Sequence, residues 1–144
     1  MRFRVEIDPD REEEILARVH RRTELIDRIE VLVQGRDRLT GYTEDDWKEL
    51  SFSEIECVLV QEDKTYAVDI RGERFRLKAR LYELEALLPD SFLRINKSAL
   101  ANRERIDRFT VSFNGAVDVI FKSGYRDYVS RRCFRVIKER MGIK

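Results

Sequence analysis

From residue 36 onward the sequence consists of short runs that alternate apolar and polar residues, and this pattern restricts the fold more than any other feature. Alternation with period two places every second side chain on one face of a half-buried β-strand. Dipeptides suited to tight turns, such as Asp63-Lys64 and Asn114-Gly115, stand between several runs. The runs predict strands over residues 38–42, 48–52, 55–62, 65–70, 74–77, 92–95, 108–113, 117–121 and 125–129. We therefore expect a mainly β domain of antiparallel sheets with peripheral helices, in the α+β class.

Two helices are expected among these strands. Residues 79–88 carry apolar side chains at helical spacing, and the proline that follows them ends the helix. A last helix is expected from Ser130, whose hydroxyl can cap its first turn, through Met141. Phe134, Ile137 and Met141 lie on one face of this last helix.

The N-terminal segment has a different pattern. Apolar and charged residues alternate over residues 1–7, which predicts a strand. Asp8 can cap a long amphipathic helix that begins at the following proline and stops at Gly35. We expect this strand and helix to form an extension over residues 1–45, followed by a domain over residues 46–144. The apolar stripe of the helix either packs within its own chain or pairs two copies.

The charges are unevenly distributed along the chain. The formal net charge is only +1, but residues 1–91 carry 16 Lys+Arg against 23 Asp+Glu, a net of −7, and residues 92–144 carry 13 against 5, a net of +8. This asymmetry indicates that a polyanion binds the C-terminal third. Mutual neutralisation of opposite charges across the folded surface explains the same counts, and charge alone does not decide between the two.

Several classes of protein are not indicated. The sequence has no apolar run of the roughly 20 residues that span a bilayer and no secretory signal, so we expect a cytoplasmic protein without membrane insertion. Cys57 and Cys133 are far apart, which argues against a disulfide framework or a zinc site. The sequence shows neither a cluster of acid, base and nucleophile nor a glycine-rich phosphate loop, so we expect no catalysis, no metal and no cofactor.

Three segments carry most of the functional information, and the last of them is the tip Glu62-Asp63-Lys64-Thr65 between two strands. The other two carry side chains suited to DNA. In the first, buried neighbours are expected to anchor a short connection that presents Asn96, Lys97 and Ser98 outward, as amide, ammonium and hydroxyl groups that bond bases and phosphates. In the second, Arg131 and Arg132 follow the helix cap, beside backbone N–H groups that attract phosphate. Two cations are unfavourable at the positive end of a helix, and an anionic partner would account for their placement.

Residues 46–144 resemble the LytTR family of bacterial DNA-binding domains. The similarity lies in FSEIECVLVQEDKTYAV, LKARLYELEALLPDSFLRINKSALANRERI and GYRDYVSRRCFRVIKERMG. The family motif combines an F-x-R-[hydrophobic]-x-[RK]-S run that ends in Asn with a later S-R-R before a terminal helix. It is matched here by Arg94, Lys97, Ser98, Asn102, Ser130, Arg131 and Arg132. The strand-helix prefix is similar to that of small stand-alone members that lack a receiver domain.

The resemblance implies that loops and strand ends, not a recognition helix, enter successive major grooves. Lys64 on the first hairpin tip, Lys97 and Arg132 would then read the grooves. The supports or phosphate contacts would be Arg94, Asn96, Ser98, Ser130 and Arg131. The chain departs from many family members in having Asn96 where they have His, which leaves the base preference undetermined.

These observations predict a sequence-specific, double-stranded DNA-binding transcription regulator that is response-regulator-like but has no phosphoacceptor domain. Because one such domain covers few base pairs, we expect a homodimer or two copies on adjacent half-sites. The alternative is a protein–protein module that binds a membrane or signalling partner through the acidic N-terminal helix. That alternative leaves the basic C-terminal segments unexplained, although a regulatory membrane protein is compatible with either function.

Overall fold

The computed structural model describes residues 1–34 and 38–142 and divides the chain into two compact units, Met1–Arg36 and Asp37–Lys144. The first unit contains one helix, α1 (Glu24–Gln34). The elements of the second unit are β1 (Arg38–Tyr42), β2 (Trp47–Ser51), η1 (Phe52–Glu54), β3 (Ile55–Gln61), β4 (Lys64–Asp69), β5 (Arg74–Leu77), α2 (Leu81–Leu87), β6 (Phe92–Asn96), β7 (Ala99–Asn102), η2 (Arg103–Arg105), β8 (Ile106–Val111), β9 (Val117–Phe121), β10 (Arg126–Val129) and α3 (Arg131–Met141).

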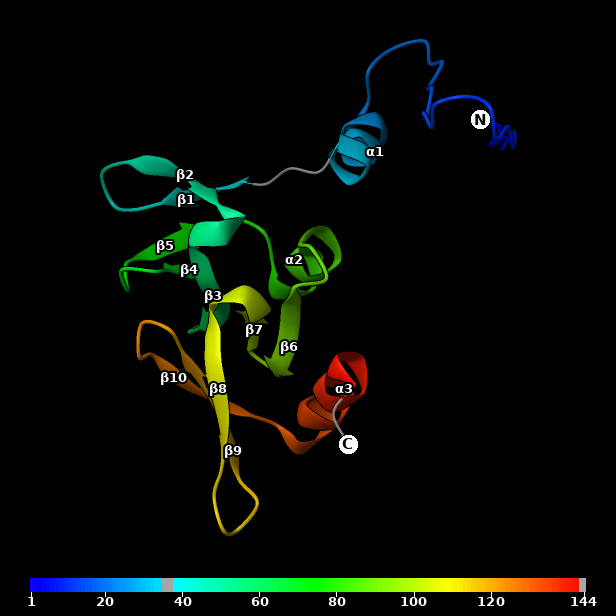
Figure 1. Cartoon of the computed structure of the whole chain (residues 1–144). Helices are drawn as coiled ribbons and strands as arrows, with labels where there is room; N and C mark the ends of the chain where they lie inside the picture. Colours follow the sequence, from blue (N-terminus) through cyan, green and yellow to red (C-terminus); the bar gives the residue numbers. More distant parts are fainter. Residues whose placement is uncertain (35–37, 143–144) are drawn as a thin grey trace. The chain divides into compact units, whose positions relative to one another are not determined.

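The strands of the second unit form two antiparallel sheets (Figure 1). The larger sheet has seven strands in the order β2-β1-β5-β4-β3-β7-β6, and the smaller has three in the order β10-β9-β8. Neighbouring strands in both sheets are antiparallel. The predicted class, mainly β with peripheral helices, is confirmed.

The larger sheet is covered on both faces, because successive side chains of its strands belong to two different core clusters. In β3, Cys57 and Leu59 belong to one core cluster while Val58 between them belongs to another. The cluster of Val58 includes the buried residues of α2, and the cluster of Cys57 includes those of β9, β10 and α3. The seven-stranded sheet is therefore the middle layer, between α2 on one face and the small sheet with α3 on the other (Figure 1).

The hairpin between β3 and β4 turns through two residues. Glu62 and Asp63 both have positive φ, +52° and +62°, and Gln61 pairs directly with Lys64. This is the type I′ geometry whose twist matches that of the flanking strands. The turn lies one residue earlier than the predicted Asp63-Lys64, so Lys64 is the first residue of β4.

The N-terminal predictions are partly wrong. Residues 1–7 form no strand, and the helix begins at Glu24, not after Asp8. Phe3 and Ile7 are exposed, because no second strand pairs with this segment and a lone strand leaves its backbone groups without partners. A short helix without packing is only marginally stable in water, and Ile15 in the non-helical part is also exposed. The predicted stop at Gly35 lies outside the described residues.

One strand was not predicted. β7 was expected to be part of a short connection, yet it is a strand of the large sheet, between β3 and the edge strand β6. The predicted division between residues 45 and 46 stays a prediction; β1 and β2 on either side of it pair with each other in the second unit. Over the described residues, no helix combines the length and apolar composition that a bilayer crossing requires.

Candidate nucleic-acid interface

The turn between β6 and β7 presents one cation at the end of the large sheet. Asn96 pairs with Ala99, so Lys97 and Ser98 form the two-residue turn, and Lys97 is exposed. Ile95 and Ala99 on either side are buried, as the sequence predicted. A short loop between buried strand ends therefore fixes the backbone of Lys97, and its side chain is exposed at the end of the sheet.

Asn96 does not face outward, so that prediction is wrong. The side chain is 1% exposed; its Nδ2 donates to the Tyr128 carbonyl at 2.9 Å and its Oδ1 accepts from the Ser98 N–H at 2.8 Å. The register of β6 shifts between Arg94 and Asn96, and such a bulge redirects the side chains that follow it. Asn96 therefore joins the Lys97 turn to the end of β10 from inside the domain.

The Arg94 side chain is also hydrogen-bonded to this turn. Its Nε donates to the Asn96 carbonyl at 2.7 Å and its Nη2 to the Lys97 carbonyl at 2.8 Å. Its Nη1 pairs with the Glu85 carboxylate of α2 at 2.7 Å. A guanidinium group with three such bonds stabilises the turn by closing it against α2, and it has few donors left for a ligand.

The start of α3 lies beside the same turn. The Ser130 hydroxyl accepts from the Cys133 N–H at 3.2 Å, which is the predicted helix cap, and the Ser130 N–H donates to the Ile95 carbonyl at 2.9 Å. Arg131 and Arg132 follow and are exposed. The bond between Ser130 and Ile95 thus places two guanidinium groups next to the strand that carries the Lys97 turn.

Lys64 lies at the same end of the large sheet. The Val60 N–H donates to the Ser98 carbonyl at 2.8 Å, and Val60 pairs with Thr65, the residue that follows Lys64. Lys64 is exposed beside the hairpin tip. The structure therefore brings Lys64, Lys97 and the Ser130–Arg132 segment to one end of the domain, although they come from distant parts of the sequence.

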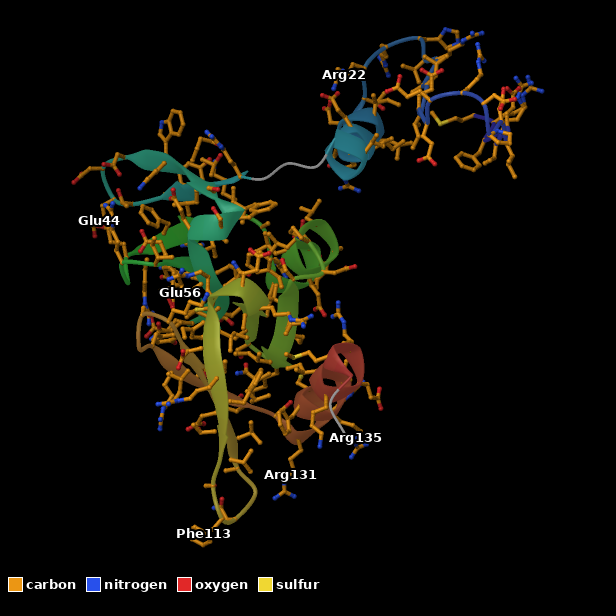
Figure 2. The ribbon with its side chains drawn as sticks, viewed as in Figure 1. Arg22, Glu44, Glu56, Phe113, Arg131 and Arg135 are labelled. Carbon is orange, nitrogen blue, oxygen red and sulfur yellow. The ribbon has the colours of Figure 1, made fainter. Side chains whose placement is uncertain are left out.

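One more cation belongs to this region and was not singled out from the sequence. Arg135 is exposed one helical turn after Arg131, and Figure 2 shows both on α3. The spacing of four residues along a capped helix was the available signal, because such residues share a face. We define the basic end by its five exposed cations: Lys64, Lys97, Arg131, Arg132 and Arg135.

The carboxylate of Asp127 lies behind the basic end. Burial raises the pKa of this carboxyl group above its ordinary value, and the Tyr128 backbone N–H and the Asn96 side chain oppose that rise. The Tyr128 N–H reaches Asp127 Oδ1 at 2.8 Å. Because Asp127 is half-buried and hydrogen-bonded, its charge is set back from the exposed row of cations.

The Asn96→Ala variant tests whether Asn96 holds the turn to β10. It leaves the Tyr128 carbonyl and the Ser98 N–H without their partner, so we expect unfolding free energy to fall by about 1–3 kcal/mol in urea titrations. Ser98→Ala is the control, because it removes a nearby hydroxyl but keeps the N–H. Equal stability of Asn96→Ala and the parent chain would mean that these two bonds do not hold the site.

The second unit is similar in sequence to known proteins. The LytTr DNA-binding domain family matches residues 45–142. An uncharacterized HTH-type transcriptional regulator of a bovine strain of Staphylococcus aureus is 36% identical over 107 residues, which are 73% of this chain and 71% of that protein. A counterpart from another strain of the same species is 34% identical over 105 residues, with the same coverage.

A solved structure is similar over the same region. The LytTr DNA-binding domain of a methyl-accepting/DNA response regulator from Bacillus cereus matches with a TM-score of 0.71 and 26% sequence identity. The match covers 76% of this chain and all of the solved domain.

Proposed function

Because the chain belongs to the LytTR family of DNA-binding domains, we propose that it is a transcription regulator that binds double-stranded DNA through its basic end. The observation that carries the proposal is the hydrogen bond from the Ser130 N–H to the Ile95 carbonyl, because it sets Arg131 and Arg132 beside the Lys97 turn. Cations fixed at the ends of rigid elements match the charge of a duplex, whose phosphates dominate affinity.

The proposed roles follow from side-chain chemistry. Lys64, Lys97 and Arg132 read base edges in the major groove, where ammonium and guanidinium groups bond guanine acceptors. Ser98 and the start of α3, with Ser130 and Arg131, contact phosphates, because free N–H groups at a helix start attract anions. Arg94 and Asn96 are positioning residues, since their polar groups are bonded within the protein.

The proposed reading does not use a helix-turn-helix, although the printed name of the staphylococcal relatives contains that term. Within residues 1–34 and 38–142, strands separate each α-helix from the next along the chain. The elements that present cations are the β6–β7 turn, the start of β4 and the first turns of α3. We therefore propose that loops and strand ends of a β scaffold enter the major groove.

The remaining parts of the proposal concern organisation. We propose that residues 46–144 form the DNA-binding domain, that residues 1–45 are an extension, and that two copies occupy adjacent half-sites. We also propose a cytoplasmic location, which a DNA target supports. Binding to a membrane or signalling protein is not favoured as the main function, and a regulatory membrane partner stays a prediction.

Salt dependence tests the proposal. Duplexes retained by the chain from a random-sequence pool are titrated at several salt concentrations. We expect log K to fall against log[salt], at about −0.9 per phosphate neutralised. The slope per bound copy should be about −2 if only Arg131 and Arg135 neutralise phosphates, and up to about −4.5 if all five cations of the basic end do. Arg131→Ala should make that slope shallower by about one. Failure of the unchanged chain to retain any duplex at low salt would refute the proposal.

A further inference from the structure

The hairpin between β8 and β9 carries an exposed aromatic side chain at its tip. The relative exposure of Phe113 is 105%, and Val111 before it is 61% exposed. Figure 2 shows Phe113 at the free end of the hairpin. The Phe113 ring buries no apolar surface in this unit. An aromatic side chain offers a large, rigid contact area to a partner.

The loop around Phe113 is fixed by its own hydrogen bonds. The Ser112 N–H donates to the Ala116 carbonyl at 2.9 Å, and Gly115, at φ +87°, donates back to the Ser112 carbonyl at 2.9 Å. Asn114 Oδ1 accepts from the Ala116 N–H at 3.1 Å and from the Ser112 hydroxyl. Because the polar side chains of the loop are used to build it, the ring is the group that the tip presents to a partner.

The register of the small sheet sets this tip beside the start of α3. Val129, the last residue of β10, pairs with Val117, and Val117 pairs with Val111. The loop therefore begins level with the end of β10, one residue before the Ser130 cap. Since two strand spacings separate β8 from β10, Val111 at the base of the loop lies about 10 Å from Val129. Figure 2 shows Phe113 and Arg131 at the same end of this unit.

The charges around the hairpin tip indicate which kind of partner it contacts. Residues 109–117 and 128–138, which form the tip and its neighbouring helix start, contain no Asp or Glu, while the second stretch contains three Arg and one Lys. An apolar ring beside a cationic helix start suits the sugar-lined wall of a duplex next to bound phosphates. The major groove is about 12 Å wide, so a ring carried two strands to the side of a groove-bound helix start reaches toward the adjoining minor groove.

We infer that Phe113 is a DNA-contacting residue, placed against the sugars of the minor groove that flanks the major groove bound by the basic end. This inference rests on the proposed function. An apolar contact of this kind adds affinity without neutralising phosphate. It therefore differs from the contacts of the cations in its response to salt.

The test compares Phe113→Ala with the full unchanged chain. The ligand is a duplex recovered by the unchanged chain from a random-sequence pool, trimmed to one half-site with about ten flanking base pairs on each side. We expect Kd to rise about five- to thirtyfold, as for loss of part of a buried Phe contact, with the slope of log K against log[salt] unchanged. Tyr82→Ala is the matched control, because Tyr82 is a 67% exposed aromatic residue on α2, which covers the opposite face of the large sheet.

Three results would overturn the inference. The first is a Kd equal to that of the parent. The second is weaker binding only on duplexes that hold two copies, which would assign Phe113 to a contact between copies. The third is a slope of log K against log[salt] that is shallower by about one for Phe113→Ala, which would mean that the variant lost a phosphate contact indirectly. Failure of the proposed function is distinct, because the unchanged chain would then retain no duplex.

Discussion

A chain with both Lys97→Ala and Arg132→Ala is expected to bind its selected duplex at least about thirtyfold more weakly than the parent. Each side chain is exposed at the basic end, and a cation that reads a base contributes about 1–3 kcal/mol of discrimination. The two losses together are about 2–6 kcal/mol, and each 1.4 kcal/mol is tenfold in affinity. Each single variant should lose about 1–3 kcal/mol, as measured by fluorescence anisotropy or gel shift at fixed salt.

A matched control removes the same charge elsewhere. Lys48 lies on β2, at the opposite edge of the large sheet from β6, and Arg71 follows β4 at the end away from Lys64. Both are exposed, so Lys48→Ala with Arg71→Ala changes the net charge equally. If this control weakened binding as much as the double variant at the basic end, general charge and not the assigned site would account for affinity.

Phe121→Ala is expected to lower the free energy of unfolding by about 3–5 kcal/mol. Phe121 is 1% exposed and lies in the core cluster between the two sheets, where its ring stacks on Tyr125 at a centroid distance of 5.8 Å. Removal of the ring leaves a cavity that the surrounding strands fill only partly. Urea titration of the parent and the variant gives the difference directly.

Phe113→Ala is the control for that experiment, because it is the same substitution at an exposed position. A surface change away from caps and networks is usually within about 0.5 kcal/mol of the parent. A small effect of Phe121→Ala, comparable to that of Phe113→Ala, would contradict the layered packing of the small sheet on the large one.

The strands could be predicted where the sequence signal is local. β1, β5 and β9 have the predicted bounds, because alternation and turn residues lie within a few positions of each other. β7 was missed because all of its residues are buried, so the alternating pattern that marks a half-buried strand is absent. Residues 1–7 show the opposite case: they have the alternating pattern of a strand, but they form none in the structure.

The sequence identified most of the residues of the site, but it did not predict which of their side chains are buried. Exposed Lys97, Arg131 and Arg132 lie together as the resemblance implied, and Ser130 caps the helix. The burial of Asn96 could not be predicted, because it depends on a bulge in β6 and on a carbonyl 32 residues away. The position of the Arg94 side chain could not be predicted either, because it depends on an ion pair with Glu85 of α2 that forms only in the folded chain.

Base preference tests the central claim most directly. Random duplex pools are selected in parallel by the parent chain, by Lys97→Ala and by Arg132→Ala. We predict that each variant loses preference at a different small set of positions, and that both sets lie within one half-site of about one helical turn. Recovery of the parent consensus, undiminished at every position, by both variants would contradict the conclusion that the basic end reads DNA.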